Sequence, residues 1–150
     1  MMITRDDILA LPAELLASRD TAAIAAALSV GRVRTTEHVV SERGIIAALG
    51  VIDGEAFIAG LEAFAGATLP DGHPLRPAHP GIARMLRWLQ NEGINMGDPA
   101  ARQMLDILAS AGVVTAASAV IIKGLAEEPD PLDEYAVRCL AWSDAGEWQL

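Results

Sequence analysis

Signals that start and stop helices recur along this chain, and they limit the possible fold more than any other feature of its sequence. Thr4 and Asp7 have the spacing of a capping box, and Asp98 precedes Pro99 as an N-cap precedes a proline at the first helical position. Glycines such as Gly112 stand where these segments end. Apolar residues recur between the signals with helical spacing. We therefore predict an all-α fold, a compact bundle of about six to eight helices, most of them shorter than about 16 residues.

The apolar stripes of these segments also predict the core. Aromatic residues make up only 4% of the chain, so aliphatic side chains must fill most of the interior. We expect the following residues to be mostly buried: Leu28, Ile46, Phe57, Leu61, Phe64, Leu86, Leu89, Leu105, Leu108, Ile122 and Leu140. Further N-cap residues are expected at Asp20, Asp53, Thr115 and Asp130.

The single cysteine, Cys139, lies on the apolar stripe of the last helical segment with Tyr135 and Leu140. A cysteine nucleophile needs a nearby base and an activating environment. The sequence offers neither in an obvious position, so we predict that Cys139 is a buried structural thiol.

Two regions interrupt the helical pattern. Residues 30–40 and the last ten residues could each hold a short strand or hairpin, and a turn at residues 144–146 would bring Trp142 towards Trp148. From Thr36 onward, however, apolar residues return with helical spacing, which favours a helix there.

Residues 67–80 contain four prolines and predict an extended, semi-rigid connector. This proline-rich connector is the best candidate for an internal boundary between two helical halves, with Pro80 starting the next helix. Because each half is small, we expect residues 1–150 to form a single helical domain.

The charge of the chain excludes several classes of partner. Its formal net charge of -9 would repel phosphate backbones and anionic lipid surfaces, so we expect neither nucleic-acid nor membrane binding. The acidic N-terminal residues do not resemble a signal peptide, and no apolar run approaches the ~20 residues that span a bilayer.

Few residues suggest catalytic or metal chemistry. His38 and Glu42 are four residues apart, which would place them on one helical face, but further metal ligands are not evident. His73 and His79 lie in the proline-rich connector, where we expect them to be solvated. Phosphate-loop, nucleophile-elbow, zinc-finger and dinucleotide patterns are absent from the sequence. We therefore predict a protein that is not an enzyme, with no cofactor, no metal and no small-molecule substrate.

Charge is distributed unevenly along the chain. Arg32, Arg34 and Arg43 form the only basic cluster, whereas residues 127–150 carry seven acids against Arg138. This polarity could orient head-to-tail contacts between subunits, or the acidic terminus could simply be solvated.

Two of the three tryptophans, Trp142 and Trp148, lie among the last nine residues, close to Leu150. They could dock onto the chain's own core, or they could contact another subunit, because tryptophan is common at interface hot spots. We predict that Trp142, Trp148 and Leu150 form a protein interface, together with the arginine cluster. On this interpretation a chain that ends at Ala141 still folds but loses its partner.

Several stretches resemble small alanine-rich proteins from the structural and tail gene region of tailed bacteriophages and prophages. The resemblance is carried by residues 23–32, 44–50, 97–117 and 125–131 and by the short tail after the last helix. It implies a virion component of the tail or neck, made in the host cytoplasm, that contacts other virion proteins or copies of itself. It implies no catalytic residues.

An alternative of a different class is a small acidic phage-encoded inhibitor. Its negative surface would occupy the nucleic-acid site of a host defence or transcription protein. Such an inhibitor needs a broad negative face, whereas most of the net negative charge here lies in one terminal segment.

Overall fold

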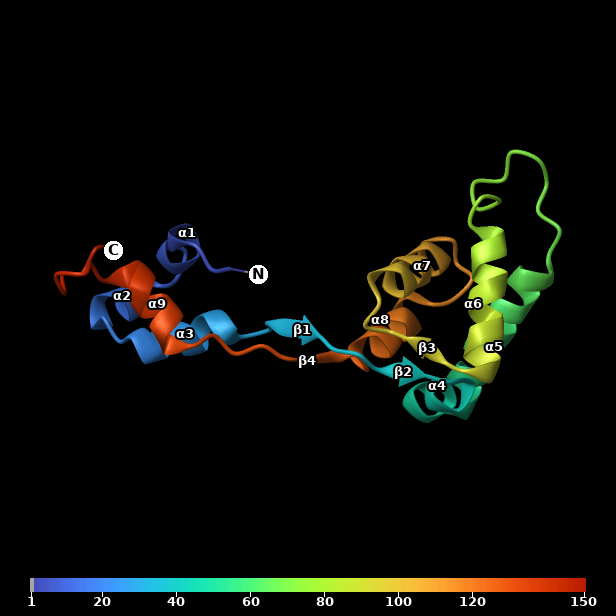
Figure 1. The fold of residues 1–150 in the computed structure, drawn as a ribbon, viewed down its shortest axis with the longest axis horizontal. Helices are drawn as coiled ribbons and strands as arrows, with labels where there is room; N and C mark the ends of the chain where they lie inside the picture. Colours follow the sequence, from blue (N-terminus) through green and yellow to red (C-terminus); the bar gives the residue numbers. More distant parts are fainter. Residues whose placement is uncertain (1) are drawn as a thin grey trace. The chain divides into compact units, whose positions relative to one another are not determined.

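The computed structural model describes residues 2–150, and these residues form a mostly helical protein with four short strands (Figure 1). The helices are α1 (Arg5–Leu9), α2 (Ala13–Ser18), α3 (Thr21–Ser29), α4 (Glu42–Leu49), α5 (Val51–Gly66), α6 (His79–Asn91), α7 (Pro99–Ser110), α8 (Ala116–Gly124) and α9 (Glu134–Ala141). The strands are β1 (Val33–Thr35), β2 (Val39–Val40), β3 (Ile94–Asn95) and β4 (Glu127–Pro129). The described residues thus form nine helices, more than we predicted, and the fold is not purely all-α.

Contacts divide the chain into two compact units instead of the expected single domain. The terminal unit comprises residues 1–34 and 128–150, and the central unit comprises residues 35–127. The chain passes from one unit to the other in β1 and again in β4, which pair in a two-stranded sheet. The expected boundary at residues 67–80 therefore does not coincide with the division.

The proline-rich connector lies inside the central unit, between two helices that pack against each other, α5 and α6. Its first residues are not part of any turn, and Ala67 is extended as expected. Residues 71–78 instead contain turns, with hydrogen bonds from the amide of His73 to the carbonyl of Pro70 and from that of Arg76 to the carbonyl of His73. Its two ends meet where His79 Nε2 lies 2.8 Å from the carbonyl oxygen of Phe64. The connector is therefore the loop of a helical hairpin formed by α5 and α6.

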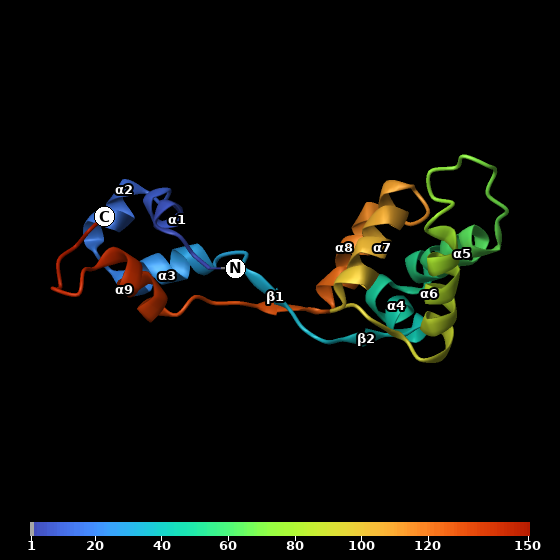
Figure 2. The ribbon, with the colours of Figure 1, turned by 45° about the horizontal axis from the view of Figure 1, so that its top comes forward.

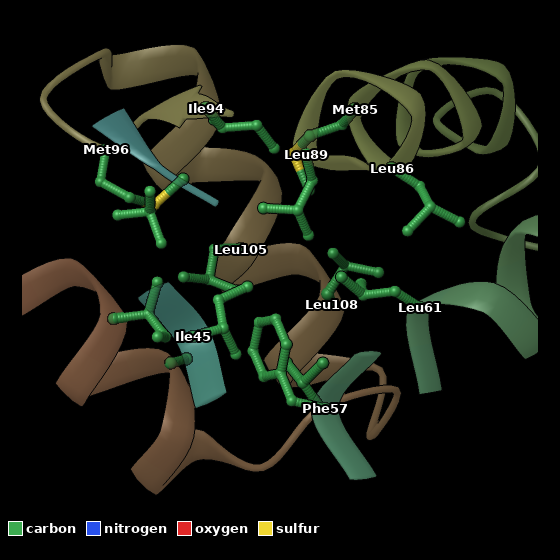
Figure 3. Close-up of a cluster of buried hydrophobic side chains, with 14 of the residues drawn as sticks. Ile45, Phe57, Leu61, Met85, Leu86, Leu89, Ile94, Met96, Leu105 and Leu108 are labelled. Carbon is green, nitrogen blue, oxygen red and sulfur yellow. The ribbon is translucent and has the colours of Figure 1, made fainter. Parts of the chain in front are cut away.

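The core of the central unit is formed by side chains from α4 to α8, with β2 and β3 (Figure 3). Every core residue that we predicted from the apolar stripes is at least half-buried in one unit or the other. The fully buried ones are Phe57, Leu61, Leu86, Leu89, Leu105, Leu108 and Ile122, and the half-buried ones are Leu28, Ile46, Phe64 and Leu140.

The helix expected from Thr36 onward begins only at Glu42, whereas β1 and β2 lie within residues 30–40, where a short strand was the alternative. Val39 and Val40 instead form β2, which pairs antiparallel with β3, so that Val40 faces Ile94 in register. Ser41 then caps α4 by accepting a hydrogen bond from the Gly44 amide at 3.2 Å. Burial of Val40 in the central core, through a partner strand far away in the sequence, outweighs the local helical spacing.

The terminal unit has a smaller core of Ile8, Ile24, Ala25 and Val137. Its helices α3 and α9 pack side by side (Figure 1 and Figure 2). Thr4 and Asp7 form the predicted capping box at the start of α1. Hydrogen bonds from the Thr4 side chain and amide lower the pKa of the Asp7 carboxyl.

The orientation of α9 differs from the prediction. Val137 and Ala141 are its buried residues, whereas Cys139 is exposed and Tyr135 is 70% exposed. Apart from the side that carries Glu134 and Arg138, apolar residues occupy the circumference of this helix, so its sequence does not define a narrow stripe. A hydrogen bond with Cys139 raises the pKa of Tyr135 on the exposed side. The prediction of a buried structural thiol is wrong.

Two predicted N-caps are also wrong. Asp53 lies within the first turn of α5, which begins after Gly50, where φ is 83°. Asp133 rather than Asp130 caps α9, because the helix begins at Glu134. Asp130 pairs with Arg32.

Candidate functional site

The residues after α9 form a hairpin that brings two predicted interface residues together. Trp142 and Trp148 form an antiparallel bridge, and their rings meet edge to face with centroids 5.2 Å apart. The Gly146 amide donates a hydrogen bond to the Ser143 carbonyl at 2.8 Å, and Gly146 adopts a φ of 79°. The predicted turn at residues 144–146, and the approach of the two indoles, are therefore confirmed.

This hairpin is attached to the terminal core. Trp148 and Leu150 are half-buried against that core, and the Gln149 amide donates to the Ala141 carbonyl at 2.9 Å. The Arg19 guanidinium lies over the Trp148 ring, 6.0 Å from its centroid. The sequence left open whether these residues pack on the chain's own core or contact another subunit, and Trp148 and Leu150 pack on the core. Their role at an interface with another subunit stays a prediction.

The basic and acidic segments pair with each other inside the chain. Arg32 pairs with Asp130 and Arg34 pairs with Glu128, each with a nitrogen–oxygen distance of 3.1 Å. The other carboxylates of residues 127–134 are also engaged: Glu127 pairs with Arg102, Asp133 caps α9, and Glu134 accepts a hydrogen bond from Thr21. Much of the charge polarity seen in the sequence is therefore used intramolecularly.

The other candidate residues do not gather in one place. Arg43 is exposed on α4. His38 precedes β2 and lies outside the helix that begins at Glu42, so the two do not share a helical face. His73 and His79 are half-buried and hydrogen-bonded, not solvated. Within residues 2–150, no group of three or more His, Cys, Asp or Glu side chains could hold a metal ion.

Helix α8 has a surface that the sequence analysis missed. Its inward side holds Ser118, Ala119 and Ile122, which are buried in the central unit. Its outward side is also apolar, because Val120 is 65% exposed and Ile121 is 47% exposed. The other exposed residues of α8 are Ala116, Ala117 and Gly124. We call these five exposed residues the α8 face.

A groove of about 420 Å³ adjoins the α8 face within the central unit. Ala117 and Ile121 form one side of it, and Leu49, Ala56 and Phe57 contribute from α4 and α5. Among the residues that the structure describes, Asp53 is the only charged one that lines the groove. The arrangement can accept apolar side chains beside one carboxylate, which suits a protein contact better than catalysis.

A sequence signal for the α8 face does exist. The helix reads Ala-Ala-Ser-Ala-Val-Ile-Ile-Lys-Gly, and Lys123 is its only charged residue. A helix that is apolar around its whole circumference is normally buried on all sides. Lys123 itself pairs with Asp106 of α7. The outward side of α8 therefore lacks the polar residues typical of a helix that faces water.

Comparisons with protein-family models, with curated proteins and with solved structures find no match to this chain. None of the helices formed by residues 2–150 is long and apolar enough to cross a membrane.

Proposed function

We propose that this protein is a non-enzymatic structural component of a bacteriophage particle, in the tail or neck, that acts through contacts between subunits. The observation that carries the proposal is the exposed apolar α8 face with its adjoining groove. Contiguous apolar surface is unfavourable in water and marks a site of protein contact. The resemblance to tail-region proteins supplies the setting in which such a contact would form.

The state of the acidic segment bears on the alternative of an acidic inhibitor. An inhibitor that mimics nucleic acid needs carboxylates free to face a basic partner. All five carboxylates of residues 127–134 already form an ion pair with an arginine or accept a hydrogen bond from a hydroxyl or a backbone amide of the same chain. This engagement favours the assembly proposal over the inhibitor.

Val120→Asp tests the proposal, because it places a charge on the α8 face. Val30→Asp is the matched control, since Val30 is 82% exposed and lies in the terminal unit. Each variant would complement a phage that lacks the gene, and gradient-purified particles would be probed for the protein. Val120→Asp should fold, as judged by circular dichroism, and be lost from particles, whereas Val30→Asp should be retained. Equal incorporation of both variants would count against the α8 face as the assembly contact.

A further inference from the structure

The terminal unit contains a hollow of about 440 Å³ beside the C-terminal hairpin. Its lining combines two guanidinium groups, two hydroxyls, one indole and one carboxylate, from Arg19, Arg138, Thr21, Ser143, Trp142 and Asp144. Arg19 is the C-cap of α2, and Thr21 is the first residue of α3. Arg138 lies in α9, and the other lining residues belong to the C-terminal hairpin. Cations, hydroxyls and an aromatic wall together are suited to an anion that carries an apolar group.

The two arginines of this hollow lack ion-pair partners within residues 2–150, although the terminal unit is rich in acids. Glu134 stands four residues before Arg138 on α9, the usual position for a helical ion pair. It instead accepts a hydrogen bond from the Thr21 hydroxyl at 2.7 Å. Asp144 lines the same hollow without approaching either guanidinium within ion-pair distance. Both guanidinium groups therefore remain available to a ligand.

Arg19 is held in place by two features. Among the residues that the structure describes, it is the one non-glycine residue with a positive φ, 55°, at the end of α2. Its guanidinium lies over the Trp148 ring, which in turn meets Trp142 edge to face.

The charges of the hollow indicate a ligand with a single negative charge. Two arginines and Asp144 leave one net positive charge, which matches a carboxylate better than a phosphate dianion. Trp142 offers an apolar wall in the same hollow. A chain terminus ending in an apolar residue carries its carboxylate and its apolar side chain on the same carbon atom.

We propose that this hollow binds the carboxyl terminus of a partner polypeptide whose last residue is apolar. Arg19 and Arg138 pair with the carboxylate, the Ser143 hydroxyl lies at its edge, and the apolar side chain contacts Trp142. The existence of such a partner rests on the proposed function, but the chemistry of the hollow does not, because it can be measured on the isolated protein.

The full-length protein carrying Trp88→Phe is the material for the test, because its remaining tryptophans, Trp142 and Trp148, both lie in the terminal unit. The probe is N-acetyl-glycyl-glycyl-leucine, titrated while tryptophan fluorescence is recorded. The peptide should change the fluorescence saturably, with binding that weakens as salt is added. The same peptide with a C-terminal amide should bind about tenfold more weakly or not at all.

Two variants assign the binding to the arginines. Arg138→Gln should lower the affinity for the peptide about tenfold or more. Arg19→Lys should also lower this affinity although it keeps the charge, because lysine lacks the planar guanidinium that pairs with both carboxylate oxygens. Arg43→Gln, an exposed arginine of the central unit, should have no effect. Equal binding of acid and amide, tighter binding of inorganic phosphate than of the peptide, or unchanged binding by Arg138→Gln would each overturn the proposal. Such a failure would leave the presence of the protein in particles, and hence the proposed function, untouched.

Discussion

Loss of the Trp148 side chain should destabilise the terminal unit selectively. The indole is half-buried against the small core of the terminal unit, and the Arg19 guanidinium lies over its ring. A buried tryptophan covers roughly 150–250 Å², which at about 25 cal/mol/Å² corresponds to about 4–6 kcal/mol for full burial. Because Trp148 is half-buried, we expect Trp148→Ala to cost about 2–4 kcal/mol. A unit of roughly 60 residues is typically stable by only about 3–9 kcal/mol, so this loss is a large fraction.

Hydrogen exchange measured by mass spectrometry resolves the two units, because peptides from α3 and α9 report on one and peptides from α5 to α8 on the other. Trp148→Ala should raise exchange throughout α3 and α9 and leave the central unit protected. Trp88→Ala is the matched control, since Trp88 is 51% exposed on α6 of the central unit. It should leave the terminal unit unchanged. If Trp148→Ala kept full protection in α3 and α9, the hairpin would not belong to the terminal core.

Three further changes test other parts of the structure. Leu105→Ala empties space in the central core and should cost about 2–5 kcal/mol in urea unfolding, and a near-neutral result would mean that α7 is oriented differently. Gly60→Ala places a Cβ 2.5 Å from a backbone oxygen of the turn after α7 and should cost about 1–3 kcal/mol, whereas Gly66→Ala, with open space around it, should be neutral or stabilising. Thr4→Ala removes the main hydrogen bond that lowers the Asp7 pKa, so that pKa should rise towards its ordinary value in an NMR titration. Because the folded pKa is depressed, the stabilisation from Asp7 is present above the unfolded pKa and is lost as pH falls through the folded pKa. An unchanged titration of Asp7 in Thr4→Ala would contradict the assignment of this pKa shift to Thr4.

Local interactions account for the parts of the fold that could be predicted. The caps at Thr4, Asp20, Asp98 and Thr115 are present as expected, because each joins groups within two or three residues of one another. The C-terminal turn is also local, and it places Trp142 beside Trp148 as predicted. These features depend on sequence spacing alone.

Pairings between distant segments account for most of what the prediction missed. Strand β2 exists because β3 lies beside it, and neither Val39 nor Val40 indicates a partner more than fifty residues away. The pairs Arg32–Asp130 and Arg34–Glu128 join segments almost a hundred residues apart and hold acids that we expected to act between subunits. Such pairings depend on topology, which local spacing does not encode.

The α8 face could have been predicted from the sequence if the side of the helix opposite its buried stripe had been considered. The apolar stripe of α8 correctly identified Ile122 as buried, but the stripe says nothing about the opposite side of the helix. Val120 and Ile121 stand where a solvated helix carries charged residues. Only the structure shows that no other part of the described chain covers them.

Quantitative mass spectrometry of purified particles, from a phage whose genome carries this sequence, tests the proposed function most directly. We predict that the protein is present at a fixed ratio to the major tail or neck proteins and stays bound through a high-salt wash, because an apolar contact such as the α8 face is little affected by salt. Absence of the protein from intact particles, together with its expression early in infection, would contradict the structural role and favour the acidic inhibitor.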